Sequence, residues 1–423
     1  MADTPSHAAP RRRRTLLVTL LPGVALFAIV IVGLVGLSLR TEPRASNLDG
    51  RDLVEFPAPD PDEPVEAIEA VIDKSWMAGV EDWAGDQIPG RATWLSIHAV
   101  VQTDALQDPV VDDVYMDGPD GFLFERHLDR SVPENMAANA QALSDQLAEA
   151  EIPLMWIYAP RKEELRPEVT PEAWGNDLVT ERPNVLAALD TGDPMLDLTQ
   201  TFDDPELFRV QYFRNDHHWT ADAAALAVQE SAELARDELG VDIPDDARSY
   251  ERVIYDDAAF YGTLGRRVTA PVTPGKDFLS WMEPEGGFSA RQCLDDACDS
   301  PLINTYRLEE DSLYANRYRV FLGGDSGLLR IVNEDAPSDT TAVLLKDSYG
   351  NPFAMYLAER VRELYVIDER HYDGDLEMTE FAADVDADIM MVLHNQVSLL
   401  GVTRFDSTSW VDVKGASTYV EGD

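Results

Sequence analysis

Beyond residue 120, short apolar runs of strand length alternate with longer amphipathic segments of helical length. The clearest strand-length runs are Ile152–Tyr158, Thr341–Leu345, Leu364–Ile367 and Ile389–Leu393. The segments with helical periodicity are Glu134–Glu151, Ala221–Leu239 and Pro352–Val361. Short apolar strands that alternate with helices are typical of a parallel sheet covered on both faces. The pattern therefore predicts an α/β domain of three layers (α/β/α), in which a mainly parallel sheet lies between two layers of helices.

Other parts of the chain carry weaker signals. Residues 66–106 are expected to be mostly helical, and Gly121–Glu125 is expected to be a short strand after a turn. Tyr318–Leu322 and Leu328–Val332 are further expected strands, separated by a glycine-rich turn. Residues 245–315 are rich in turn-forming residues, so we interpret them as an irregular insertion or a β-rich excursion from the main domain.

The N-terminal region has the pattern of a membrane anchor. Residues 15–39 contain no charged side chain and follow four consecutive arginines. A helix of this length exceeds the roughly 30 Å hydrocarbon core of a bilayer, and the arginines favour the cytoplasm. We expect residues 1–14 to be a cytoplasmic tail, 15–39 a transmembrane signal anchor, 40–65 a linker, and 66–423 an extracytoplasmic domain. A cleaved signal peptide and a buried core helix are the alternative interpretations.

Charge narrows the range of possible partners. The chain has 79 acidic and 34 basic residues and a formal net charge of −45. Such a surface repels the phosphates of nucleic acids, so nucleic-acid binding is not expected. The acidity is typical of a well-solvated surface, of adaptation to salt or of a secreted protein. No Gly-rich phosphate-binding motif follows a strand, so the sequence gives no support for a nucleotide cofactor.

The two cysteines, Cys293 and Cys298, are close together in the sequence. In an extracytoplasmic domain we expect them to form a disulfide that closes a small loop. A zinc site is less favoured, because two thiols without a nearby third ligand are a poor ligand set.

Two stretches carry candidate catalytic side chains. Asp216-His217-His218-Trp219 places two imidazoles beside a carboxylate, and Ser348 follows an expected strand and precedes an expected helix. A serine hydroxyl becomes an effective nucleophile when an imidazole accepts its proton and a carboxylate orients that imidazole. Backbone N–H groups at the start of a helix stabilise a developing oxyanion. Together, the two stretches predict a Ser-His-Asp triad.

Each stretch also has other interpretations. A serine at the end of a strand commonly caps a helix, and an Asp-His-His run can bind a metal ion or form a structural hydrogen-bonded pair. Ser326, in the Gly-Asp-Ser sequence at 324–326, is a second candidate nucleophile. The apolar run after Ser326 is an expected strand and not a helix, so we favour Ser348.

The segment Tyr212–Thr220 resembles the signature of the DHHW proteins, which are similar to the alginate O-acetyltransferase-like proteins of the SGNH-hydrolase superfamily. Further segments that match this pattern are Asp86–Arg91, Asp120–Phe124, Phe321–Gly324 and Lys346–Gly350. The resemblance implies an SGNH-like domain in which the Asp/His loop precedes the nucleophile, a permuted order. It implies Ser348 as nucleophile, His218 as base and Asp216 as the residue that orients the base; the role of His217 stays open.

On this basis we expect a membrane-anchored extracytoplasmic enzyme that transfers or removes an acyl group, such as acetyl, on a cell-surface polysaccharide. The residues expected at the oxyanion and substrate-binding site are Gly323, Gly324, Tyr349, His217 and Trp219. The expected partners are the membrane, the polysaccharide and, for a transferase, a membrane-bound acyl-exporting protein. No metal or organic cofactor is expected. The alternative is a non-catalytic cell-envelope protein that binds glycan or another envelope protein.

Overall fold

The computed structural model describes residues 45–55, 75–88, 90–128, 131–170, 175–244, 247–294, 297–372 and 376–401. The chain divides into two compact units, the first ending at His98 and the second beginning at Ala99. The second unit carries the α/β domain. The predicted signal anchor, residues 15–39, lies outside the described residues. Among the described helices, none is long and apolar enough to cross a bilayer.

The first unit contains a small hairpin, one complete helix and most of a second helix. Residues expected to belong to a linker form two short antiparallel strands, β1 (Ala45–Ser46) and β2 (Arg51–Asp52). Helices α3 (Ser75–Asp86) and α4 (Arg91–Val100) follow. The guanidinium of Arg51 contacts both carboxylate oxygens of Asp86 at 2.8 and 2.9 Å, which fixes the hairpin beside α3.

The second unit is built on an eight-stranded mixed sheet, with the order β11-β10-β12-β14-β13-β15-β6-β7. The parallel strands are β14 (Glu363–Ile367), β13 (Thr341–Lys346), β15 (Ile389–Asn395), β6 (Leu154–Ala159) and β7 (Met195–Asp197). The antiparallel strands at one edge are β12 (Leu328–Val332), β10 (Arg291–Leu294) and β11 (Ala297–Ser300). The expectation of a mainly parallel sheet therefore holds for the centre and not for this edge. The chain between β10 and β11 is too short for the crossover that parallel strands need.

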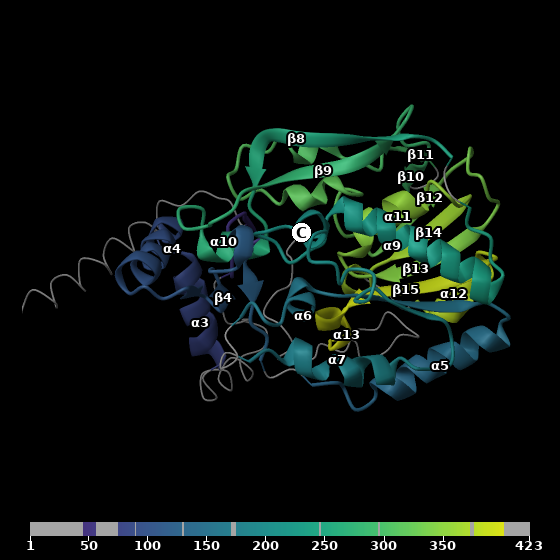
Figure 1. Cartoon of the computed structure of the whole chain (residues 1–423), viewed down its shortest axis with the longest axis horizontal. Helices are drawn as coiled ribbons and strands as arrows, with labels where there is room; N and C mark the ends of the chain where they lie inside the picture. The colour runs from purple at the N-terminus through teal and green to yellow at the C-terminus, as the bar shows by residue number, and fades with distance from the viewer. Residues whose placement is uncertain are drawn as a thin grey trace, which may run out of the picture. The chain divides into compact units, whose positions relative to one another are not determined.

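Helices cover both faces of the sheet, as the alternating pattern predicted (Figure 1). On one face the core includes side chains from α9 (Ala221–Leu234) and α11 (Gly350–Leu357). On the other face it includes side chains from α5 (Met136–Glu149), α7 (Asp177–Ala188), α12 (Met378–Asp384) and α13 (Gln396–Leu399). In β15, Met391 and Leu393 point into the first core, whereas Met390 and Val392 point into the second. This two-residue alternation explains why the central strands are continuously apolar.

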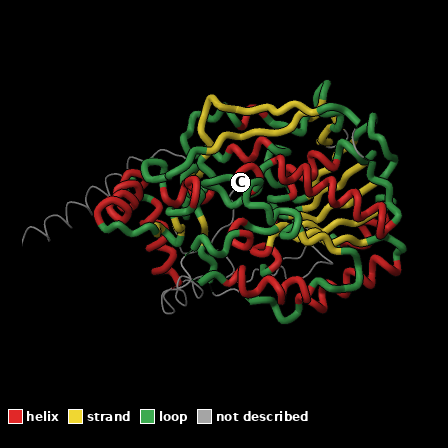
Figure 2. Tube along the Cα trace, in the orientation of Figure 1, coloured by secondary structure: helices red, strands yellow, loops and turns green. Residues whose placement is uncertain are grey.

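Smaller elements surround the sheet (Figure 2). A three-stranded sheet contains β3 (Val110–Val111), β4 (Val114–Tyr115) and β5 (Phe124–Glu125). Two short helices, α6 (Lys162–Leu165) and α8 (Phe208–Gln211), precede the Asp-His-His loop. Residues 245–315 are more regular than expected: they form a long antiparallel pair, β8 (Tyr250–Phe260) and β9 (Asp277–Pro284), and a helix between them, α10 (Thr263–Val268).

The prediction of a strand over Tyr318–Leu322 is wrong. Residues 317–320 form a short 3-10 helix, and only Phe321 makes an isolated bridge to Ile303. The backbone then turns through positive φ at Leu322, Gly323 and Gly324. A strand cannot continue through three such residues, because positive φ lies outside the β region. The buried apolar side chains of this segment therefore belong to a 3-10 helix and a turn, and not to a strand of the sheet.

Candidate active site

Ser348 lies where the central strand β13 ends and α11 begins, at the carboxyl edge of the parallel strands. The preceding residue fixes this turn: the Asp347 carboxylate accepts hydrogen bonds from Tyr349 N at 2.9 Å and from Asn395 N at 2.7 Å. Asn395 is the last residue of the neighbouring strand β15, and its side-chain amide also donates to Asp347 at 2.6 Å. Two adjacent strand ends therefore hold the serine in place. Ligand sites in open α/β sheets form at this edge.

The Asp-His-His loop lies between α8 and α9. It is closed at its base by Thr220 N, which donates to Gln211 O at 2.9 Å, and the side chain of Thr220 accepts from Ala223 N and caps α9. The side chain of Asn215 accepts from Gly262 N at 2.7 Å and donates to Phe260 O at 3.0 Å. These contacts join the loop to the chain between β8 and α10, although that chain follows some 45 residues later.

The loop and the serine meet in a hydrogen-bonded row. His218 Nε2 lies 2.7 Å from Ser348 Oγ, and His218 Nδ1 lies 2.5 Å from Asp216 Oδ1. All three side chains are almost completely buried. The ring of Tyr318 stacks on His218, with centroids 4.0 Å apart and an angle of 15° between the planes. In this arrangement one imidazole can accept the serine proton while the carboxylate holds the other ring nitrogen.

Asp216 is held as a carboxylate. Its Oδ1 also accepts from His218 N at 2.8 Å, and its Oδ2 accepts from Thr263 N at 2.7 Å. Burial by itself would raise the pKa of Asp216, but the two adjacent imidazoles and these hydrogen bonds hold the pKa well below its usual value. Gly262 packs directly against it: a Cβ at Gly262 would lie 2.0 Å from Asp216 Oδ2. Only glycine allows this approach of the backbone.

Comparison with known proteins supports this fold and motif. A family model described as a DHHW protein matches residues 206–367, and a second, described as an SGNH hydrolase-like domain, acetyltransferase AlgX, matches residues 116–281. The predicted resemblance to DHHW and AlgX-type proteins is confirmed. Both matches include Asp216, His217 and His218, and the DHHW match also includes Ser348.

Solved structures share the fold of the DHHW and AlgX-like region at low sequence identity. PatB1 from Bacillus cereus is 19% identical, with a TM-score of 0.56, over 66% of this chain and 95% of that one. PatB1 with a sulfonyl adduct is 17% identical, with a TM-score of 0.53, over 68% of this chain and 97% of that one. A DHHW family protein from Eubacterium siraeum is 17% identical, with a TM-score of 0.52, over 66% and 89%. No curated protein sequence matches this chain.

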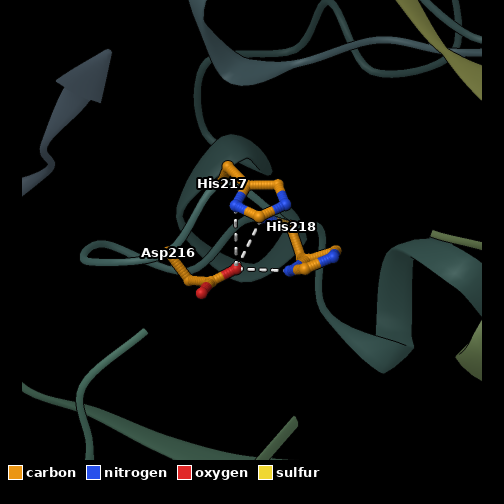
Figure 3. Close-up of side chains that lie close together, drawn as sticks. All are labelled: Asp216, His217 and His218. Carbon is orange, nitrogen blue, oxygen red and sulfur yellow. Dashed lines mark hydrogen bonds and ion pairs between the residues drawn. The ribbon is translucent and has the colours of Figure 1, made fainter. Parts of the chain in front are cut away.

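The other residues of the DHHW motif join the two halves of the site. Trp219 is completely buried, and its indole N–H donates to Tyr349 O at 2.9 Å. The Tyr349 hydroxyl donates to His217 O. Trp219 and Tyr349 were expected at the oxyanion and substrate-binding site; their buried side chains connect the loop to the turn at Ser348. His217 keeps a side-chain exposure of 12%, against 1% for His218. Figure 3 shows both imidazoles beside the Asp216 carboxylate.

The two predicted glycines, Gly323 and Gly324, lie between two anchored residues. On one side, the Tyr318 hydroxyl donates to Ser348 O at 3.3 Å. On the other side, Asp325 accepts from Lys346 Nζ at 2.8 Å, and Lys346 is the last residue of β13. The N–H of Gly324 already donates to Phe321 O at 3.1 Å. By contrast, the backbone N–H groups of Gly323 and Ser348 have no hydrogen-bond acceptor among the described residues.

Sequence reasoning missed several residues of this site. Asn304 has a buried side-chain amide nitrogen without a partner, 3.5 Å from the position of a Cβ at Gly323. Lys162 contacts the Asp-His-His loop from α6. No local motif surrounds Asn304 or Tyr318, so only their position in the folded chain reveals them. Lys162 did carry a signal, because a lysine beside the apolar strand end at Ala159-Pro160 lies at the carboxyl edge of the sheet.

A metal ion at the Asp-His-His cluster is the other chemical interpretation. Asp216, His217 and His218 offer ligand atoms within 4.8 Å of one another. Ligands about 2 Å from one tetrahedral ion lie roughly 3 Å or more apart. The separation of 2.5 Å between Asp216 Oδ1 and His218 Nδ1 is that of a short hydrogen bond. The geometry favours a proton between these two atoms.

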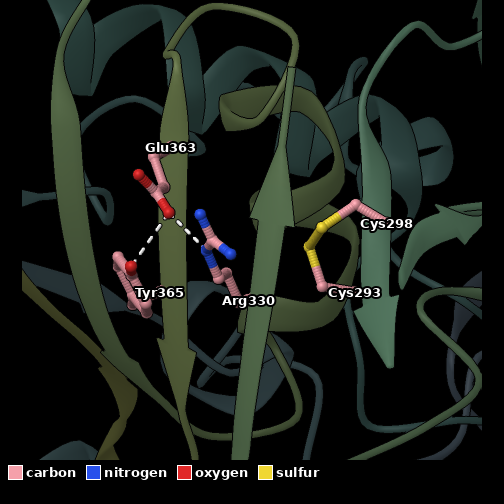
Figure 4. Close-up of a disulfide and its surroundings, with 5 residues drawn as sticks. All are labelled: Cys293, Cys298, Arg330, Glu363 and Tyr365. Carbon is pink, nitrogen blue, oxygen red and sulfur yellow. Dashed lines mark hydrogen bonds and ion pairs between the residues drawn. A yellow bond between two sulfur atoms is a disulfide. The ribbon is translucent and has the colours of Figure 1, made fainter. Parts of the chain in front are cut away.

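The cysteines lie on β10 and β11, whereas Ser348 follows β13, and β12 and β14 lie between them in the sheet. Cys293 and Cys298 form a disulfide with an S–S distance of 2.00 Å, which joins β10 to β11 at the antiparallel edge (Figure 4). Arg330 and Glu363 form an ion pair on the neighbouring strands β12 and β14. The disulfide links the two outermost strands at this edge, and the ion pair links the third and fourth strands.

Proposed function

We propose that this chain is a membrane-anchored extracytoplasmic acyltransferase or esterase that uses Ser348, His218 and Asp216 on an acyl group, such as acetyl, of a cell-surface polysaccharide. The observation that carries the proposal is the pair of contacts made by His218, 2.7 Å to the serine hydroxyl and 2.5 Å to the carboxylate. The match to a family model named for an acetyltransferase supports the choice of acyl chemistry.

The reaction would proceed in two halves. Ser348 Oγ attacks the ester carbonyl while His218 Nε2 takes the hydroxyl proton, and the same nitrogen then gives this proton to the departing alcohol. The product is an acyl-serine. His218 next takes the proton of an acceptor hydroxyl, which attacks the acyl carbon; the same nitrogen then returns a proton to Ser348 Oγ as the bond between the serine and the acyl group breaks. A sugar hydroxyl as acceptor gives transfer, and water gives hydrolysis.

Negative charge on the carbonyl oxygen needs nearby donors. We assign this role to the backbone N–H groups of Ser348 and Gly323 and to the side-chain amide of Asn304, because each has a donor without a partner among the described residues. Such donors are effective when they are fixed before the reaction. The positive φ of Gly323 helps to set the direction of its N–H group.

The experiment compares the full-length chain with its Ser348→Ala and Ser326→Ala variants on 4-nitrophenyl acetate. Ser326 is exposed in the turn after Gly324 and serves as the matched control. We expect Ser348→Ala to lower kcat by about 10³-fold or more, and Ser326→Ala to leave it unchanged. A sulfonyl fluoride should label Ser348 in the active proteins, in line with the sulfonyl adduct of PatB1.

Several outcomes would overturn the proposal. Equal inertness of wild type and Ser348→Ala on several esters, without acyl-serine by mass spectrometry, would favour the non-catalytic envelope protein. Loss of activity in Ser326→Ala but not in Ser348→Ala would assign the nucleophile to Ser326. Stoichiometric zinc, whose removal stops the reaction, would favour the metal interpretation.

A further inference from the structure

Two lysines, Lys162 and Lys346, are almost completely buried at the carboxyl edge of the sheet, and their ammonium groups contact different kinds of acceptor. Lys346 faces carboxylates, with its Nζ 2.8 Å from Asp325 and 3.1 Å from Asp368. Lys162, on α6, forms no ion pair within the described residues, although its side chain is 0% exposed. A buried cation without a carboxylate partner is costly unless its protons are fully hydrogen-bonded.

All three N–H groups of the Lys162 ammonium are directed at the Asp-His-His loop. Its Nζ lies 3.2 Å from Phe213 O, 3.1 Å from Arg214 O and 2.6 Å from Asp216 O. An ammonium group has three donors, so this set uses all of them. The shortest contact is to the carbonyl of the residue whose side chain orients His218.

We propose that Lys162 is a positioning residue for the proposed reaction: its ammonium group gathers three carbonyl oxygens of the loop and thereby holds Asp216 and His218 against Ser348. The inference rests on the proposed function. Lys162 touches no reacting atom in this arrangement, because its contacts go to the main chain of the loop. Its effect would be geometric, and displacement of a catalytic group by about 1 Å can lower a rate by roughly 10²-fold.

Protonation makes this role testable. Burial lowers the pKa of Lys162 from its usual value to about 8. Nearby Glu163, Asp216 and Asp277 act in the other direction, whereas the positive charge of Arg161 adds to the lowering. A neutral amine has two donors and a lone pair, so one of the three carbonyls would then face a lone pair. We therefore expect activity to fall as the pH rises through about 8.

Folding stability should change in the opposite direction over the same range. Between about pH 8 and the unfolded pKa of roughly 10.4, the unfolded chain holds a proton on Lys162 that the folded chain has lost. The contribution of Lys162 to stability therefore rises with pH while activity falls. An alkaline loss of activity from this lysine cannot be a loss of fold.

The first measurement is the pH profile of ester hydrolysis by the full-length chain, by Lys162→Met and by Lys276→Met. Lys276 is exposed and is the matched control. We expect Lys162→Met to lower kcat by about 10- to 100-fold with KM within about twofold, and to lose the alkaline limb near pH 8. Lys276→Met should keep both. A Lys162→Met enzyme with the wild-type kcat and the wild-type alkaline limb would overturn the proposal.

The second measurement does not depend on activity. Hydrogen exchange of peptides that cover residues 212–220, corrected for intrinsic rates, should show about tenfold protection in wild type at pH 6.5 over pH 9.5. Lys162→Met should show low protection at both values. Equal protection of wild type at the two values would sink the positioning role, even if Lys162→Met fails to fold. If wild type hydrolyses no ester, the proposed function fails while this measurement still decides the role of Lys162.

Discussion

His217 and His218 are neighbours in the sequence, but their surroundings assign them different tasks. His218 has both ring nitrogens engaged, by Asp216 and by Ser348. The His217 ring lies beside the His218 ring with centroids 3.8 Å apart and the planes tilted by 35°, and His217 is more exposed. Burial and the neighbouring His218 hold the pKa of His217 well below its usual value, so His217 is neutral at pH 7.

This difference predicts unequal effects of the same substitution. His218→Asn should lower kcat by about 10³-fold or more, because the serine then has no base. His217→Asn should lower kcat by about tenfold at most, because Ser348 keeps His218 as its base. Steady-state kinetics between about pH 5 and pH 8 measure both effects. A larger loss in His217→Asn than in His218→Asn would reverse the assignment.

At the scale of elements, the site depends on close contact between a loop and the start of α10. Thr263 donates its N–H to Asp216, and Gly262 leaves no space for a side chain beside this carboxylate. The contact is between backbone and a buried side chain, so neither partner can move aside easily.

Gly262→Ala therefore tests the placement of Asp216. We expect the variant to lose about 1–3 kcal/mol of unfolding free energy and about 10²-fold in kcat, because the new methyl group displaces the carboxylate. Gly85→Ala is the control, since Gly85 lies in α3 with nothing within 4 Å of an added Cβ. Denaturant unfolding and ester kinetics report the two quantities. Wild-type values in Gly262→Ala would show that Asp216 is not held as described.

The sequence predicted the central elements because each has a local signal. The apolar runs at β13 and β15 and the helix after Ser348 lie where the pattern placed them. The 3-10 helix at 317–320 was mistaken for a strand, because apolar residues before Gly323-Gly324 suit a strand end equally well. Asn304 could not be assigned, because its place beside Gly323 depends on the folded chain. Lys162 follows a strand end, which is a local signal, but its contacts with the loop join segments more than 50 residues apart. The antiparallel sheet edge likewise depends on which strands pair, and composition does not encode pairing.

At the scale of the whole molecule, charge is the dominant property. The formal net charge of −45 implies self-repulsion within the folded chain. Many basic residues are already engaged in ion pairs, such as Arg267 with Glu125 and Arg252 with Asp222, so the acidic excess remains. Salt screens this repulsion over a Debye length of about 10 Å at 0.1 M.

We expect the melting temperature at pH 7 to rise by several degrees between about 20 mM and 0.5 M NaCl, because screening relieves repulsion that weakens on unfolding. At pH 4.5, where many exposed carboxylates are protonated, the same salt step should have a smaller effect. Calorimetric scans at the two salt levels measure it. A melting temperature that is insensitive to salt at pH 7 would contradict this account of the surface.

The hydrogen bond between His218 and Ser348 spans 130 residues of chain, and it forms across a sheet whose strand order differs from the order along the chain. β13 lies between β14 and β15, both of which are later in the sequence. Contacts of such long range form late in folding, because their loop-closure entropy must first be overcome. We therefore expect the serine to meet its base only after the C-terminal strands have joined the sheet. A chain that ends before β14 would therefore carry Asp216, His218 and Ser348 but lack two strands that flank β13, and we expect it to be inert.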